Sequence, residues 1–188
     1  MDFEFSETSQ RMQAALKAFM AAHVAPREAD WTRLVEGEGV FPPPFLEDLK
    51  AKARAEGLWN LFLPGLKPDE PGTRMSNLDY APCAEIMGRI PWASEVFNCN
   101  APDTGNMELL HLAATPAQKA QWLTPLLEGR IRSAFAMTEP EVASSDATNI
   151  RTAIRRDGNE WVVDGRKWFI TNAGHPNCRI FIIMGVTG

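Results

Sequence analysis

Hydroxyl and other small polar side chains gather in the segment FAMTEPEVASSDATN, residues 135–149. An apolar run ends at Thr138, and mostly small or polar residues follow until Ile150. Such a segment can be an ordinary turn whose Ser, Asp and Asn side chains bond their own backbone. It can also be a loop of free N–H and O–H donors that suits an anionic or heteroaromatic ligand. Taken alone, the segment favours the ordinary turn.

A second segment, GRKWFITNAG at residues 165–174, adds a flat surface beside hydrogen-bond donors. The letters WFI place three bulky side chains in succession, so at least one faces away from the core side of a strand. Trp168, followed by Thr171 and Asn172, could stack on a ligand, although core packing is the commoner role of a single Trp. Together the two segments indicate a ligand site more strongly than either does alone.

The first part of the chain, up to about residue 128, has the hydrophobic spacing of helices. The predicted helices cover residues 8–24, 43–57, 77–90, 107–113 and 115–122. Pro26 is expected to end the first helix, and Asn77 is expected to cap the third. Thr115 followed by Pro116 predicts a capped helix with a proline in its first turn.

In the rest of the chain, residues 131–137 and 150–155 alternate in side-chain type with a period of two, which is typical of strands, and further short β-rich runs follow. The predicted strands cover residues 131–137, 150–155, 160–163, 167–171 and 180–184. Asp157-Gly158 and Asp164-Gly165 are turn dipeptides between short runs. The predicted fold class is α+β: an N-terminal all-α helical domain at 1–128, then a β-meander or β-barrel-like middle domain at 129–188. Five strands without a closing element indicate an incomplete β domain, so we expect the N-terminal part of a longer enzyme.

The composition and charge of the chain limit the classes of partner and the cell compartments that we expect. A net charge of -5 argues against broad nucleic-acid binding. No apolar run approaches the roughly 18 residues of a membrane span, and the N-terminus resembles neither a secretory signal nor a transit peptide. Three widely spaced cysteines indicate reduced thiols, and no Cys or His pair has zinc-ligand spacing, so no metal site is predicted. We expect a cytoplasmic protein, or a mitochondrial matrix protein if the source is eukaryotic.

The two segments resemble the acyl-CoA dehydrogenase family of flavoproteins. The resemblance rests on FAMTEP at 135–140 and KWFITN at 167–172, spaced as that family spaces them. It covers the whole chain, as N-terminal helical and middle domains without the C-terminal helical bundle. The stretch VASSDATN, 142–149, is most similar to the branch of acyl-CoA dehydrogenase family members ten and eleven.

The resemblance implies FAD as cofactor and a role for each matched residue. Met137 and Thr138 would contact the pyrimidine side of the flavin, and Trp168 would pack against the isoalloxazine. Thr171 would bond near flavin N5, and Ser145 would also lie near the substrate's CoA portion. The implied cofactor-binding residues are Phe135, Met137, Thr138, Ser144, Ser145, Trp168, Ile170 and Thr171.

The loop after Pro140 departs from the family pattern, and the family's catalytic residue has no counterpart in this sequence. Many members carry TEPGAGSD, whereas here one more residue and no glycine separate Pro140 from Asp146. Either Ser144 or Ser145 could therefore contact the pyrophosphate. The family's catalytic carboxylate lies in a C-terminal domain beyond this sequence, so neither Glu139 nor Glu141 nor Asp146 is assigned as the base.

The implied reaction is the α,β-dehydrogenation of a fatty acyl-CoA thioester with hydride transfer to flavin N5, as in fatty acid β-oxidation. The implied partners are an electron-transfer flavoprotein and further copies of the chain, in a homodimer or homotetramer. Two alternatives stay open. One is an acyl-CoA oxidase or nitroalkane-oxidase-like enzyme that uses oxygen, and the other is a non-catalytic CoA-binding or assembly scaffold.

Overall fold

The structure is a computed structural model that describes residues 4–187. It divides the chain into two compact units, residues 1–104 and 105–188. The predicted domain boundary, between residues 128 and 129, falls within the second unit. The predicted outer limits, residues 1 and 188, and the first residues of the N-terminus lie outside the described residues.

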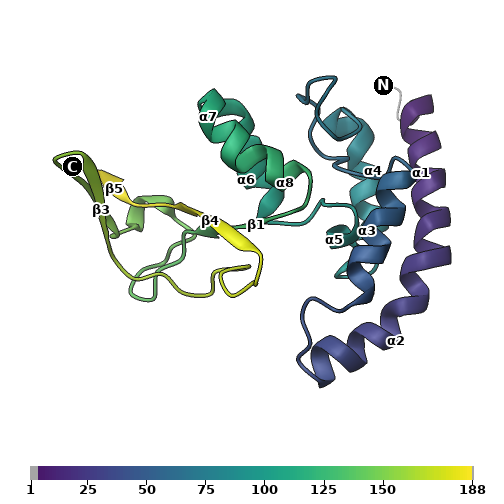
Figure 1. The fold of residues 1–188 in the computed structure, drawn as a ribbon, viewed down its shortest axis with the longest axis horizontal. Coiled ribbons are helices and arrows are strands. Elements are labelled where there is room, and N and C mark those ends of the chain that lie inside the picture. The colour runs from purple at the N-terminus through teal and green to yellow at the C-terminus, as the bar shows by residue number, and fades with distance from the viewer. Residues whose placement is uncertain (1–3, 188) are drawn as a thin grey trace. The chain divides into compact units, whose positions relative to one another are not determined.

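The first unit is helical (Figure 1). Its elements are α1 (Glu7–Phe19), η1 (Met20–Val24), η2 (Ala25–Arg27), α2 (Glu28–Trp31), η3 (Thr32–Gly37), α3 (Phe45–Ala55), α4 (Asn77–Met87) and α5 (Ala93–Val96). Ser6 caps α1 and donates to the Asp79 carboxylate at 2.6 Å, while the Ser9 hydroxyl donates to the Asp79 carbonyl at 3.0 Å. These bonds hold the start of α1 against α4.

The predicted first helix is confirmed, but its predicted end at Pro26 is wrong. Leu16, Phe19 and Val24 are buried, as the spacing requires. The helical path continues to Gly37 because the π-helical turn η1 precedes the proline. Pro26 then lies in the first turn of the 3₁₀ segment η2, where a missing N–H costs little.

The next two helices follow the predictions except at the two ends of α4, which stops at Met87 rather than 90 and has a different cap. Helix α3 buries Leu46, Leu49 and Ala53, and Gly57 takes the left-handed φ of 72° that suits the position after a helix end. The cap of α4 is Ser76 rather than Asn77, because the Ser76 hydroxyl accepts from the Asp79 N–H at 3.1 Å. Asn77 lies one position too late and is the first helical residue.

The second unit begins with helices and continues with strands. Its helical elements are α6 (Asp103–Ala113), whose first two residues belong to the first unit, α7 (Pro116–Gln118), η4 (Lys119–Leu123), α8 (Thr124–Leu127) and η5 (Ala147–Asn149). The predicted cap at Thr115 is confirmed as a capping box: its hydroxyl accepts from Gln118 N, and its N–H donates to Gln118 Oε1. The helical path that starts there runs to Leu127, past the predicted end at residue 122.

The strands form two small sheets, so the predicted meander is not observed. They are β1 (Arg132–Ala136), β2 (Ala153–Asp157), β3 (Glu160–Asp164), β4 (Cys178–Ile183) and β5 (Val186–Thr187). Strand β1 pairs with β4 in parallel, and β2 lies between antiparallel β3 and parallel β5. The α+β class is confirmed, and the described strands form no closed barrel.

Two strand predictions fail for identifiable reasons. Strand β2 starts at Ala153 rather than 150, because the N–H groups of Arg151 and Thr152 donate to a carboxylate and not to a sheet partner. Residues 167–171 form no strand. Phe169 has a φ of 51° and Asn172 a φ of 67°, and left-handed residues interrupt a ladder. By contrast, the turn at Asp157-Gly158 is confirmed, with Gly158 at a φ of 58° in the β2–β3 hairpin.

Candidate functional site

The structure brings the two polar segments together in the second unit. The backbone N–H of Trp168 donates to the carbonyl oxygen of Thr138 at 3.1 Å. The ammonium of Lys167 donates to the carbonyl oxygen of Met137 at 2.8 Å. Residues 167–168 therefore lie against the end of β1, where the chain leaves the sheet and the polar loop begins.

A buried carboxylate, Glu139, holds this arrangement. Its Oε1 accepts from the Thr152 hydroxyl at 2.6 Å, from Thr152 N at 2.8 Å and from Lys167 Nζ at 2.9 Å. Its Oε2 accepts from Arg151 N at 2.8 Å, and the residue is only 4% exposed. The hydrogen bonds from Thr152 and then Lys167 lower the pKa of Glu139 to about 2. Glu139 is thus ionised in the folded protein, and each of its two oxygens accepts at least one hydrogen bond.

Gly165 allows the chain after strand β3 to pack closely against Thr152, one of the residues that donate to Glu139. A Cβ built on Gly165 would lie 2.3 Å from Thr152 Oγ1 and 2.8 Å from Thr152 Cα. Real side chains do not approach this closely, so the Asp164-Gly165 dipeptide gives close packing against Thr152. Strand β3 ends at Asp164, and the chain passes Thr152 on its way to Lys167.

The two candidate serines have different surroundings. Ser144 is 6% exposed, and its Oγ accepts from Glu139 N at 2.7 Å and approaches the carbonyls of Val142 and Glu139 at 3.2 and 3.3 Å. Its hydroxyl is therefore used within the loop. Ser145 is exposed, so its hydroxyl is open to a ligand. The geometry favours Ser145 as the predicted phosphate contact and gives Ser144 a positioning role.

Two aromatic rings lie exposed in the second segment. Trp168 is 42% exposed and Phe169 is 82% exposed, and their centroids are 4.5 Å apart with the planes tilted by 38°. Sequence reasoning selected Trp168 and passed over Phe169, which is the more exposed ring. Phe169 has a positive φ, which directs its ring toward solvent. No residue type in the motif predicts this backbone conformation. Beside them, Thr171 is exposed and Ile170 half-buried.

The remaining predicted residues lie at the end of β1. Phe135 is half-buried and pairs with Ile182 of β4, and Met137 and Thr138 are half-buried just beyond the strand. The far end of the aromatic segment is also fixed to this strand, because Asn172 Nδ2 donates to the Ser133 carbonyl at 3.1 Å. Asn172 stands in the motif, but its anchoring role was not foreseen.

The other acidic residues of the loop have structural partners. Asp146 accepts from Thr148 N at 3.0 Å and from the Thr148 hydroxyl at 2.6 Å, which lowers its pKa. Glu141 lies 3.8 Å from an Arg166 nitrogen. These contacts agree with leaving the loop carboxylates out of the catalytic assignment.

The described residues, 4–187, hold neither a metal-ligand cluster nor a membrane-spanning helix. In this part of the chain, no group of three His, Cys, Asp or Glu side chains could hold a metal ion. The helices described there include none long and apolar enough to cross a membrane. Cys83, Cys99 and Cys178 form no disulfide, and burial raises the pKa of Cys83 to about 11 and that of Cys99 to about 12.

Comparison with known proteins gives the family. A family model described as the acyl-CoA dehydrogenase N-terminal domain matches residues 6–130, and the model of the middle domain matches residues 134–188. This chain belongs to the acyl-CoA dehydrogenase family. Acyl-CoA dehydrogenase family member 11 of Gallus gallus is 50% identical over 190 residues, which cover 98% of this chain and 24% of the chicken protein. The predicted nearness to the branch of members ten and eleven is confirmed.

Solved structures of acyl-CoA dehydrogenases show the same fold. One assigned as an acyl-CoA dehydrogenase from Mycobacterium abscessus has a TM-score of 0.89 and 50% identity, and covers 98% of this chain and 47% of that chain. A glutaryl-CoA dehydrogenase from Mycobacterium smegmatis in complex with FADH2 has a TM-score of 0.71 at 18% identity, covering 97% of this chain and 43% of that chain. The chain thus spans less than half the length of these relatives.

Proposed function

We propose that this chain forms one part of the FAD site of an acyl-CoA dehydrogenase, which oxidises the Cα–Cβ bond of a fatty acyl-CoA. One observation carries the proposal. The hydrogen bond from Trp168 N to Thr138 O places the hydroxyl segment and the aromatic segment side by side. Family membership supports the same reading, and so does the FADH2 complex of the glutaryl-CoA dehydrogenase with the same fold.

The residues present fit a flavin. The exposed pair of Trp168 and Phe169 offers an apolar surface for an aromatic ring system. The Thr138 carbonyl accepts from Trp168 N and Thr171 follows the pair in the chain, so both hydroxyls are near it, and Ser145 carries an exposed hydroxyl for an anionic group. FAD, when bound, would supply the acceptor for the hydride that leaves the substrate's β-carbon.

The protein's part would be to orient the reactants and to exclude water. The aromatic pair would cover one side of the reacting groups, which removes solvent from them. The hydroxyls of Thr138 and Thr171 would donate toward negative charge that gathers during the reaction. Glu139 and Lys167 touch none of the reactants in this scheme, and they act by holding the two segments at a fixed separation.

Further parts of the proposal rest on the family. We expect the catalytic base in the region that the relatives carry beyond the matched span. An electron-transfer flavoprotein is the proposed acceptor, and a homodimer or homotetramer is the proposed assembly. Fatty acid β-oxidation is the proposed process, in the cytoplasm or, for a eukaryotic source, in the mitochondrial matrix.

An anaerobic titration of the full-length protein with acyl-CoA thioesters tests the reaction. Loss of the oxidised flavin absorbance, together with formation of the enoyl-CoA product, is the expected result. Hydrogen peroxide formed in air at the rate of turnover would instead identify an oxidase. A protein that binds acyl-CoA but never reduces its flavin would identify the scaffold alternative.

A further inference from the structure

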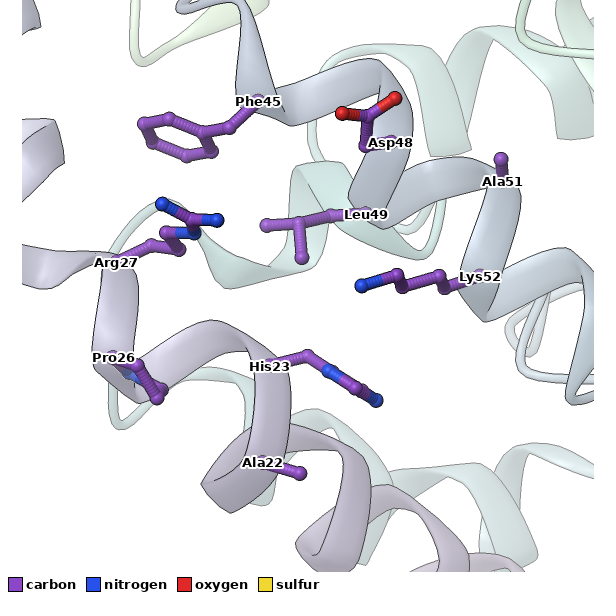
Figure 2. Close-up of a pocket in the computed structure, with 9 residues that line it drawn as sticks. All are labelled: Ala22, His23, Pro26, Arg27, Phe45, Asp48, Leu49, Ala51 and Lys52. Carbon is purple, nitrogen blue, oxygen red and sulfur yellow. The ribbon is translucent and has the colours of Figure 1, made fainter.

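A pocket of about 520 Å³ lies in the first unit, between the helical path that follows α1 and helix α3 (Figure 2). Its volume is within the range of small-molecule sites. Phe45 and Leu49 of α3 give it an apolar wall, and Ala22 and Pro26 line the opposite side. None of these residues belongs to the segments assigned to the flavin, so the proposed function does not account for this pocket.

Three basic side chains are directed into the pocket. Figure 2 shows Arg27 and His23 entering from one helical segment and Lys52 entering from the other. Within residues 4–187 the Lys52 ammonium forms no ion pair, so it is available to a ligand. Arg27 bonds Asp30 through Nη1 at 2.9 Å, which leaves most of its five N–H donors for another acceptor.

The apolar wall and the basic groups adjoin each other. The guanidinium carbon of Arg27 lies 5.6 Å from the centroid of the Phe45 ring. A molecule on the Phe45 and Leu49 side chains would therefore place a polar end beside Arg27. This arrangement suits a ligand with an apolar body and an anionic head.

Three carboxylates lie in or beside the pocket, those of Asp48, Glu56 and Asp30. Asp48 lines it, but in Figure 2 its carboxylate is directed away from Lys52. The Glu56 carboxylate lies 3.9 Å from His23 Nε2 and is the nearest competitor for that nitrogen. Among the lining residues Arg27 and Lys52 outnumber Asp48, while Asp30 and Glu56 lie outside the lining and face Arg27 and His23. A planar guanidinium fork and an ammonium that converge from different sides suit the several oxygens of a phosphate.

We propose that this pocket binds a small organic phosphate, with its phosphate beside Arg27, Lys52 and His23 and its apolar part on Phe45 and Leu49. The phosphate pairs with the cations of Arg27 and Lys52, and the apolar part covers the half-buried Phe45 ring and the small exposed part of Leu49. Inorganic phosphate lacks the apolar contact with Phe45 and Leu49, and an uncharged phenol lacks the ionic contact with the basic side chains. Both should bind more weakly than a molecule that combines the two.

Calorimetric titration of the purified full-length protein with phenyl phosphate tests this proposal. We expect saturable binding that Lys52→Gln and Arg27→Gln each weaken about tenfold. Lys17→Gln removes an exposed lysine of α1 outside the pocket and should change the affinity less than about twofold. Circular dichroism should show that all three variants are folded, since both pocket side chains are exposed.

Two comparisons decide the ligand class. Inorganic phosphate and phenol should each bind at least about tenfold more weakly than phenyl phosphate. No saturation by phenyl phosphate would overturn the proposal, and so would unchanged affinity in the Lys52→Gln and Arg27→Gln double variant, since binding would then lie elsewhere. Equal affinity for inorganic phosphate would show that the apolar wall is not used, and would also contradict the proposal.

Discussion

The ammonium nitrogen of Lys167 lies 2.9 Å from Oε1 of Glu139, and this ion pair ties the aromatic segment to the hydroxyl segment. The side chains of both partners are largely withdrawn from solvent, at 12% and 4% exposure. Removing one partner of such a pair leaves the other as an uncompensated charge away from water. The ion pair therefore helps to hold the hydroxyl segment (residues 135–149) beside the aromatic segment (residues 165–174) in the candidate flavin site, although neither residue needs to touch a ligand.

Replacing Glu139 by Gln should destabilise the protein and weaken flavin binding several-fold. Oε1 faces three donors and Oε2 faces the Arg151 N–H, so the amide NH₂ of Gln would meet a donor whichever way it turned. Thermal unfolding and flavin titration measure the two effects. Glu141→Gln is the matched control, since Glu141 is exposed and only loosely paired, and both properties should stay unchanged. Equal effects of the two substitutions would show that the Glu139 network is unimportant.

The contribution of Glu139 should disappear in acid. Its pKa is lowered from an ordinary value of 4.5 to about 2 in the folded protein, so the folded state favours the ionised form. The stabilisation is therefore complete above pH 4.5 and declines as the pH falls from there toward 2. Urea unfolding at several pH values should show the stability gap between wild type and Glu139→Gln narrowing on acidification. Asp146 also has a lowered pKa but titrates in both proteins, so its effect cancels. A gap that stayed constant with pH would contradict this assignment.

The adjacent serines should separate stability from binding. Ser144→Ala leaves the Glu139 N–H without its acceptor in a buried position, which should cost about 1–3 kcal/mol of unfolding free energy. Ser145→Ala should change that free energy by less than about 0.5 kcal/mol, yet weaken flavin or acyl-CoA binding about fivefold to tenfold. Chemical denaturation and ligand titration of both variants provide the comparison. The reverse pattern would assign the ligand contact to Ser144.

Two glycines in the same segment should respond differently to alanine. Gly165→Ala would force a Cβ to 2.3 Å from Thr152 Oγ1 and should destabilise the protein by about 1–3 kcal/mol. Gly174→Ala meets no atom within 4 Å and should stay within about 0.5 kcal/mol of wild type. Differential scanning calorimetry measures both. Equal stability of the two variants would mean that Thr152 can move aside without loss.

The spacing of apolar residues along the sequence predicted most of the helices of the first unit, but it predicted fewer of the contacts at the candidate site. Leu16, Phe19 and Val24 identify a buried helix face from sequence because that face depends on nearby residues alone. The continuation past Pro26 depends on the π-helical turn before it, and the residue types of that turn do not mark its geometry. Likewise, Ser76 and Asn77 are both good caps, and only the backbone decides between them.

The site required contacts between distant parts of the chain. Glu139 precedes a proline, as solvated turn residues often do, so its sequence position does not predict burial. Its surroundings include donors at Thr152 and Lys167, which are distant in sequence and which the fold brings together. The same holds for the choice between Ser144 and Ser145, which are identical in type and adjacent. Residues 167–171 carry consecutive bulky groups that favour a strand, but Phe169 adopts a left-handed φ that interrupts one.

The flavin content of the purified full-length protein tests the central claim most directly. We expect close to one FAD per chain, released on unfolding and regained when the apoprotein is mixed with FAD. The Ser145→Ala, Thr171→Ala double variant should regain it with clearly lower affinity, while Thr171→Ser should restore part of the loss. A colourless protein that cannot be reconstituted with FAD under conditions where it stays folded would contradict the account.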